Sequence, residues 1–248
     1  METPDMAVEI SWRSRQGRRT DANQDYCGVA LRPDAVLCVV LDGSTARQQS
    51  GELVRLIARD LTDWFILAKK GMAADDVINQ LHEIHKVRSK ELHWASASYL
   101  VALIEHERPT HIFYAGDCLV GRFDAKAPIE WLIRPHTLAN AIETISLDKI
   151  ASSTLRNKLT RSFRTKEFMA PDMATITDVG KETFAVATDG FWAELKHDDQ
   201  CRFLEGEAVQ EKGSQDVCSA LKIRILGSDN ESQVSTSTAG NLYVVESD

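Results

Sequence analysis

The order of the helical and strand-like segments constrains the fold of this chain most. An apolar, β-branched run at 36–41 predicts a buried strand. Residues 50–70 and 74–92 repeat apolar positions every three or four residues, which predicts two amphipathic helices. Four strand-like runs then follow, at 98–105, 111–115, 120–123 and 130–133. Because short turns separate these runs, we expect antiparallel neighbours, and therefore a layered α+β fold rather than alternating strand-helix units.

The remaining segments are interpreted from the same patterns. Strands are expected at 27–31, 183–188 and 241–246, and helices at 139–164 and 207–226. No repeat, low-complexity tract or linker marks a boundary within the 248 residues. We therefore expect one domain that spans residues 1–248.

Composition argues against several classes of protein. The five cysteines are scattered and form no Cys-x-x-Cys pair, which favours reduced thiols in the cytoplasm. The N-terminus lacks the apolar core of a signal peptide, and no run approaches about 18 apolar residues, so we expect neither export nor a membrane-spanning helix. A net charge of -8 argues against a general nucleic-acid-binding surface and is compatible with carboxylates gathered for metal ions.

Four aspartates stand at the ends of predicted strands. They are Asp25, Asp42, Asp189 and Asp229, and two of them, Asp42 and Asp189, are followed by glycine. Carboxylates that meet at strand ends are the hard oxygen ligands that Mg²⁺ and Mn²⁺ prefer. Each aspartate taken alone is more simply a turn or capping residue. Only their ordered combination predicts a metal site.

Seven short segments of the chain carry a resemblance to a known family. In order they are GRRTDANQDYCGV, CVVLDGSTA, ASASYLVALIE, FYAGDCLVGRF, WLIRPHT, AVATDGFWAEL and SDNESQV. This series resembles the metal-dependent PP2C-type (PPM family) serine/threonine protein phosphatases, as a divergent bacterial-type member. In that family R-x-x-N-E-D, D-G-x-G-G, G-S/T-T/A, G-D-S-R, L-T-x-D-H-S, S-D-G-L-W-D and D-N-x-T occur in the same order. The resemblance covers nearly the whole chain and implies a PP2C-like α-β-β-α sandwich of two antiparallel sheets flanked by helices.

The resemblance also implies roles for individual residues. Asp42 would bridge two ions, Mn²⁺ or Mg²⁺, and the Gly43 carbonyl would bind one of them. Asp189 and Asp229 would complete the ligands of the other ion. Asp25 would lie behind these ligands or hold a water of the metal site. These residues would form a cleft at one end of the sandwich.

The activity that the resemblance implies is hydrolysis of phosphoserine and phosphothreonine in proteins, with water activated between two metal ions. Asp42 and Asp189 would be catalytic through the ions, and Arg19 would bind the phosphate oxygens in a fork. The alternative for Arg19 is a solvated basic segment. Two alternatives to the activity stay open: a weak or inactive module that binds phosphoproteins or a regulatory partner, and a hydrolase of small phosphorylated metabolites. We expect phosphorylated proteins as partners, no nucleic acid or membrane partner, and a monomer.

The chain departs from the family pattern at three places. Gln24 stands where the family has glutamate, which removes a charge. Residues 44–46 (Ser-Thr-Ala) replace the segment that contains the family's glycines, and their Cβ atoms disfavour a turn with positive φ. Residues 118 and 119 replace the Ser and Arg of G-D-S-R, although Asp117 is kept. His136 matches L-T-x-D-H-S and is expected to be structural rather than catalytic.

Overall fold

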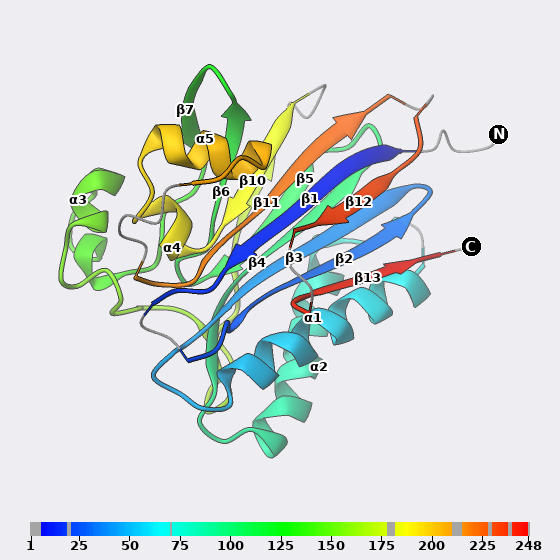
Figure 1. The fold of residues 1–248 in the computed structure, drawn as a ribbon. Helices are drawn as coiled ribbons and strands as arrows, with labels where there is room; N and C mark the ends of the chain where they lie inside the picture. Colours follow the sequence, from blue (N-terminus) through cyan, green and yellow to red (C-terminus); the bar gives the residue numbers. More distant parts are fainter. Residues whose placement is uncertain are drawn as a thin grey trace.

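The fold is a sandwich of two β-sheets with helices outside it (Figure 1). The computed structural model describes residues 6–18, 21–69, 71–177, 182–209, 215–227, 230–237 and 240–247. Within these residues, the first sheet contains β1 (Ala7–Arg15), β6 (Leu119–Asp124), β7 (Ala127–Trp131), β10 (Thr183–Ala187), β11 (Cys218–Leu226) and β12 (Gln233–Thr236). Their order across the sheet is β12-β1-β11-β10-β6-β7.

The second sheet contains the strand that the apolar run at 36–41 predicts. Its described members are β2 (Asp25–Arg32), β3 (Ala35–Gly43), β4 (Ser96–Glu105), β5 (Thr110–Ala115), β8 (Phe163–Arg164), β9 (Asp172–Ile176) and β13 (Leu242–Glu246). The order is β13-β2-β3-β4-β5-β9, and the short β8 also pairs with β4. The strand β12 runs parallel to β1, and β13 runs parallel to β2, so both sheets are mixed rather than purely antiparallel. The α+β sandwich itself is confirmed.

The helices lie on the outer faces and at one end of the sandwich (Figure 1). They are α1 (Ser50–Leu67), α2 (Ala74–Glu91), α3 (Leu147–Ala151), α4 (Asp189–Trp192) and α5 (His197–Glu205), with a 3-10 turn η1 at Leu138–Asn140. The apolar side of α1 packs on the second sheet through Leu53, Ile57 and Leu61. The predicted helices at 50–70 and 74–92 are therefore confirmed with slightly shorter bounds.

The strand β3 shows why its sequence is an unbroken apolar run. Val36, Cys38 and Val40 are buried in the core between the sheets, whereas Leu37, Val39 and Leu41 are buried in the core beneath α1 and α2. A strand covered on both faces needs apolar residues at every position, because successive side chains point to opposite faces. Asp42 continues the series 36, 38, 40 and so lies toward the space between the sheets at the strand's end.

The two predicted helices in the second half of the chain are wrong. Residues 207–226 contain β11, in which Leu221 and Ile223 are buried while Arg224 is exposed, an alternation with a period of two. Residues 139–164 contain only η1, α3 and β8 among turns. Serine and threonine side chains there bond to nearby backbone groups, as the Ser153 hydroxyl does when it accepts from the N–H of Leu155 at 3.1 Å, and such bonds compete with helix formation. The elements β1, β9, β12 and α5 were not predicted, and β7 begins and ends earlier than the expected 130–133.

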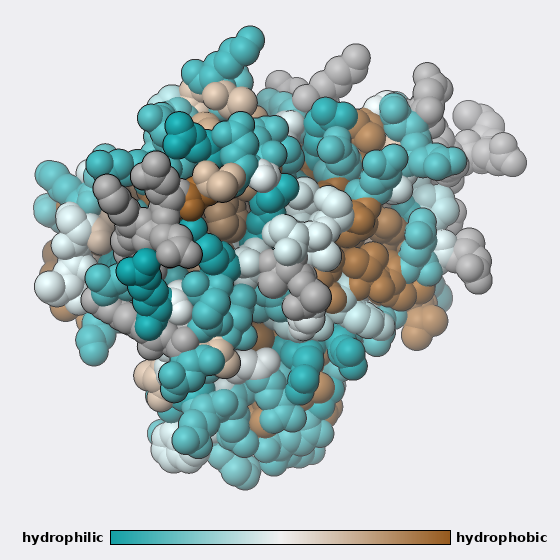
Figure 2. Space-filling model, viewed as in Figure 1, coloured by the Kyte–Doolittle hydropathy of each residue, from teal (hydrophilic) through white to brown (hydrophobic). Residues whose placement is uncertain are grey.

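The face in Figure 2 is mostly hydrophilic, with a hydrophobic area near β12 and β13, where Val244 is exposed. None of the described helices is long and apolar enough to cross a membrane. All five cysteines are free.

Candidate functional site

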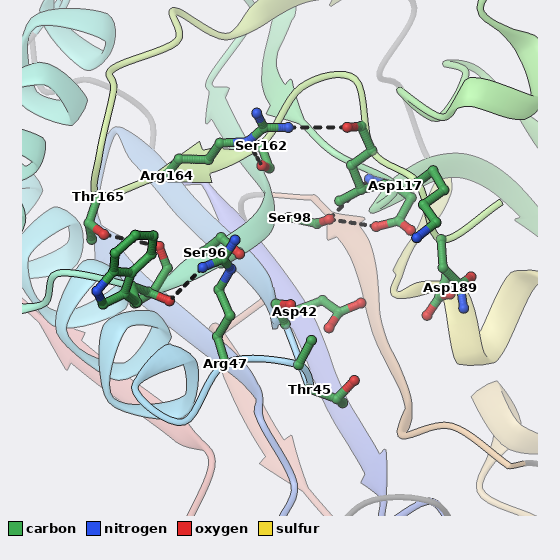
Figure 3. A pocket seen from close by; sticks show the side chains of 18 of the residues that line it. Asp42, Thr45, Arg47, Ser96, Ser98, Asp117, Ser162, Arg164, Thr165 and Asp189 are labelled. Atoms are coloured by element: carbon green, nitrogen blue, oxygen red, sulfur yellow. Dashed lines mark hydrogen bonds between the residues drawn. The ribbon is translucent and has the colours of Figure 1, made fainter. Parts of the chain in front are cut away.

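A pocket opens at the end of the sandwich where β3 ends, away from the chain termini (Figure 1). Its volume is about 700 Å³, and four aspartates line one side of it: Asp42, Asp117, Asp189 and Asp216. We call these four residues the acidic side of the pocket. Figure 3 shows three of them, Asp42, Asp117 and Asp189, around the same opening.

Asp42 and Asp25 come together because β2 and β3 are antiparallel neighbours. The two residues are direct partners in the register, so their side chains share one face of the sheet. Asp25 is buried, whereas Asp42 is half-buried and lines the pocket. Asp25 therefore lies behind Asp42 as seen from the pocket.

Asp25 also joins the two sheets. The hydroxyl of Thr188, which follows β10 in the first sheet, donates to the Asp25 carboxylate at 2.9 Å. The Thr188 hydroxyl in turn accepts from the backbone N–H of Ser219 in β11 at 3.2 Å. The Thr188–Asp25 bond joins the two sheets at the end where the acidic side lies, and the Ser219 bond holds Thr188 in place.

Asp117 is positioned by the tight turn between β5 and β6. Gly116 has φ +119°, and a Cβ there would lie 2.3 Å from the Ser98 hydroxyl, so only glycine fits. The Ser98 hydroxyl donates to the Asp117 carboxylate at 2.5 Å and accepts from its backbone N–H at 3.2 Å (Figure 3). The Asp117 side chain is thus held in one orientation.

His136 supports this turn from behind. Its Nδ1 accepts from the Gly116 N–H at 3.1 Å, so its Nε2 carries the proton and donates to Asp172 at 3.1 Å. Its ring also stacks on Tyr114, with 4.9 Å between centroids. The contacts fit the structural role that the sequence predicts for His136.

Asp189 and Asp216 are linked through one arginine and one glutamate. Arg156 lies 4.0 Å from Asp189 and forms an ion pair with Glu194 at 2.9 Å. The second oxygen of Glu194 accepts from the backbone N–H groups of Gln215 and Asp216, at 2.7 and 3.3 Å. Glu194 therefore holds the backbone that carries Asp216 and the arginine that faces Asp189.

Three carboxyl groups of the acidic side and that of Asp25 have raised pKa values, which a bound cation would lower. Burial raises the pKa of Asp25 to about 7, and burial raises the pKa of Asp42, Asp117 and Asp189. Neighbouring carboxylates raise the pKa of Asp42 further, whereas Arg156 acts in the opposite direction on Asp117 and Asp189. So many close carboxylates repel one another unless a cation compensates them.

The donor set fits hard divalent cations held partly by water. Its oxygen atoms belong to carboxylates, with a backbone carbonyl at Gly43 beside them, and such ligands suit Mg²⁺ and Mn²⁺. In the part of the chain that is described, no three acidic, histidine or cysteine side chains lie close enough to enclose one ion. Mg²⁺ commonly keeps several waters among its ligands and is held by only one or two carboxylates.

Gln24 reaches the loop that follows Asp42. The end of the Gln24 side chain faces two backbone carbonyl oxygens, those of Gly43 and Ser44. Because carbonyl oxygens only accept hydrogen bonds, the side-chain NH₂ group is assigned to this position and donates to Gly43 at 3.1 Å and to Ser44 at 3.0 Å. A carbonyl oxygen has two lone pairs, which leaves the Gly43 oxygen one acceptor site. A Cβ on Gly43 would lie 2.9 Å from the Gln24 carbonyl, so glycine is required by this close approach.

The Ser-Thr-Ala loop at 44–46 avoids the difficulty that its sequence raises. Among the described non-glycine residues, positive φ occurs at Glu107 alone. The loop is instead held by the Ser44 N–H, which donates to the Ser96 carbonyl at 3.0 Å, before α1 begins at Ser50. The missing family glycines are therefore compatible with this path of the chain.

The structure brings together part of the predicted site. Asp25, Asp42, Gly43 and Asp189 meet as expected, whereas Arg19 and Asp229 lie outside the described residues. Gly17 packs closely on the backbone of Asp216, where a Cβ would collide.

Sequence reasoning missed Asp216 and Arg156, and it gave Asp117 no role. Asp216-x-x-Ser219 has the spacing of D-N-x-T and stands just before a strand. The mistaken helix at 207–226 concealed this signal. Arg156 had no sequence signal, because its position depends on the fold of the 139–164 segment.

Comparisons with known proteins support the fold. Neither a protein-family model nor a curated protein matches the sequence. Among solved structures, the serine/threonine phosphatase Stp1 from Staphylococcus aureus is 18% identical with a TM-score of 0.72, covering 92% of this chain and 100% of its own. The PPM Ser-Thr phosphatase MsPP from Mycobacterium smegmatis is 18% identical with a TM-score of 0.70, covering 88% and 98%. The catalytic domain of the phosphatase PstP, in complex with two manganese ions, is 11% identical with a TM-score of 0.68, covering 89% and 99%. The chain therefore has the fold of PPM-type phosphatases, as the sequence predicts.

Proposed function

We propose that this chain is a PPM-type protein phosphatase that hydrolyses phosphoserine and phosphothreonine and depends on two Mn²⁺ or Mg²⁺ ions. The observation that carries the proposal is the convergence of Asp42, Asp117, Asp189 and Asp216 on one pocket of this fold. The similarity to phosphatase structures, one of them with two manganese ions, supports it. The proposal treats residues 1–248 as one domain that acts as a monomer.

The proposed ligands follow from the acidic side. Asp42, Asp189 and Asp216 and the Gly43 carbonyl would hold the ions. Asp216 takes the role that the resemblance gave to Asp229, because β11 runs from Cys218, beside Asp216, to Leu226, which pairs with Ala7 at the other end of β1. When bound, a pair of cations supplies an activated water and neutralises the charge of the phosphoryl oxygens.

The chain's own residues would position these ligands. Asp25 supports Asp42, and the Ser98 hydroxyl orients Asp117. Arg156 compensates part of the negative charge beside Asp189. Arg19 would bind the phosphate oxygens. Because serine stands at position 44, protonation of the leaving hydroxyl is assigned to water rather than to a side chain there.

Hydrolysis of a phosphothreonine peptide, with Mn²⁺ and with EDTA, tests the proposal. We expect Mn²⁺-dependent release of phosphate by the natural chain and its loss in Asp42→Asn and Asp189→Asn. Asp75→Asn, an exposed aspartate of α2, is the matched control. The same variants in a calorimetric Mn²⁺ titration separate loss of metal binding from loss of catalysis. No Mn²⁺-dependent hydrolysis by the natural chain would overturn the proposal.

The binding module remains the second candidate because of Gln24. Its amide donates to the Gly43 carbonyl where the family's glutamate would bring another negative charge. Binding of phosphopeptides with Mn²⁺ but without turnover would favour this candidate. Comparing phosphopeptides with small phosphate esters tests the hydrolase of small metabolites.

A further inference from the structure

The pocket continues beyond the acidic side to a group of positively charged residues. Arg47, Lys158, Arg164 and Lys166 line this part, which we call the basic side. In Figure 3, Arg164 lies on the side of the pocket away from Asp189. Within the described residues, none of the four forms an ion pair with a carboxylate: Arg164 donates to the Ser162 hydroxyl and the Leu159 carbonyl, and Arg47 to the Trp94 carbonyl. In a chain of net charge -8, such a group is a local exception.

The segment that carries three of these residues is fixed to the core. Arg164 belongs to β8, which pairs with Ser96 and Ala97 of β4. The Thr165 hydroxyl and N–H both donate to the Ala95 carbonyl, at 3.1 and 3.2 Å. His85 of α2 contacts the Arg164 carbonyl at 3.1 Å. The backbone is therefore held in place, while the ends of Lys158 and Lys166 are exposed to solvent.

Trp94 adds an apolar surface at the entrance of the basic side. Its side chain is 67% exposed, and the Arg47 guanidinium lies 6.0 Å from its ring centroid. A pocket of about 700 Å³ is much larger than one phosphate group requires and suits a longer ligand. The pocket thus combines an acidic side, an unpaired basic side and an aromatic surface that a peptide could cover.

We propose that the basic side binds a second anionic group of the substrate, a carboxylate or another phosphate close in sequence to the phosphorylated residue. The inference rests on the proposed function, because it places the reacting phosphate at the acidic side. Arginine forks match carboxylate and phosphate geometry, and lysines add unpaired charge that attracts either group. Substrate preference is therefore for phosphopeptides with acidic or doubly phosphorylated sequences.

Three phosphothreonine peptides test this preference: one flanked by glutamates, one by glutamines and one by a second phosphoserine. The natural chain is expected to show kcat/KM about fivefold higher for the glutamate peptide than for the glutamine peptide at low salt, with a smaller ratio at high salt. In the double variant Lys158→Gln/Lys166→Gln this ratio falls toward one. Lys126→Gln, in the turn between β6 and β7, removes one positive charge outside the pocket and leaves the ratio unchanged, and each single variant Lys158→Gln and Lys166→Gln is compared with it. The third peptide shows whether a phosphate is preferred to a carboxylate.

A second measurement separates the two proposals. Fluorescence anisotropy of unphosphorylated glutamate and glutamine peptides reports binding to the basic side without any hydrolysis. Tighter binding of the glutamate peptide, lost in the double variant, supports the inference even if no peptide is hydrolysed. Equal binding of the two peptides, or a preference that survives Lys158→Gln/Lys166→Gln, overturns it.

Discussion

The acidic and basic sides of the pocket are built in different ways. Asp42 and Asp117 are fixed by strand ends and by hydrogen bonds within the core, and Asp189 begins a buried helical turn. Arg47 and Lys158, in contrast, are exposed side chains on loops. Under the two proposals, the chemistry would depend on groups that are held rigidly at the cost of mutual repulsion, whereas recognition of a flexible substrate would use long side chains that cost little stability.

The largest effect is expected at the acidic side. Asp42→Asn removes one carboxylate of the proposed metal site and should lower kcat on the order of 1,000-fold, comparable to removing a principal electrostatic group from other active sites. Because it also removes one of several repelling charges, the metal-free variant should unfold at a higher temperature than the natural chain. Phosphate release and thermal unfolding measure the two results. A variant that is both inactive and less stable would show that Asp42 is needed for folding.

Gly116→Ala tests how tightly the turn that carries Asp117, on the acidic side, is packed. The φ of +119° and the contact with Ser98 predict a loss of about 2–4 kcal/mol in the free energy of unfolding. Gly71→Ala is the matched control, since Gly71 has φ +71° but nothing within 4 Å of a Cβ, and about 1 kcal/mol is expected there. Urea unfolding measures both. Equal losses in the two variants would contradict a sterically tight turn at Gly116.

Gln24→Glu tests the departure from the family pattern. Without metal, the carboxylate would face the carbonyls of Gly43 and Ser44 with no proton to donate, which should cost about 1 kcal/mol. Mn²⁺ should restore more stability to this variant than to the natural chain, because the added charge favours a cation. Gln24→Met removes the amide without adding charge and separates the two effects. Thermal unfolding in EDTA and in Mn²⁺ gives the comparison, and equal Mn²⁺ shifts would contradict it.

The smallest effect on stability is expected at the basic side. Arg47 is exposed, and the described hydrogen bond of its guanidinium is a 3.4 Å contact to the Trp94 carbonyl, so Arg47→Gln should change the free energy of unfolding by less than about 0.5 kcal/mol. Urea unfolding checks this value. A loss of several times that size would mean that the loop after β3 depends on Arg47, and would weaken the contrast between the two sides.

Several parts of the fold could be predicted because they depend on local pattern. The unbroken run at 36–41 and the three- and four-residue repeats of α1 and α2 reflect side-chain directions that each backbone conformation fixes. The strand β11 was missed because residues 218–221 are buried on both faces, and the alternation typical of a strand is limited to residues 221–224. The short elements within 139–164 were missed because their conformation is set by contacts with distant strands, such as β8 with β4.

The sequence by itself determined that Asp42 ends a buried strand and that the segments around Asp25, Asp42 and Asp189 follow the order of a phosphatase family. Only the tertiary structure decided which other groups meet them. Asp216 reaches the pocket through the pairing of β11 with β1 and β10, and Arg156 through an ion pair with Glu194. The physical reason is that the local backbone conformation fixes the face of a strand or helix on which a side chain lies. The residues that it meets across a pocket depend instead on sheet pairing and loop packing between segments far apart in the chain.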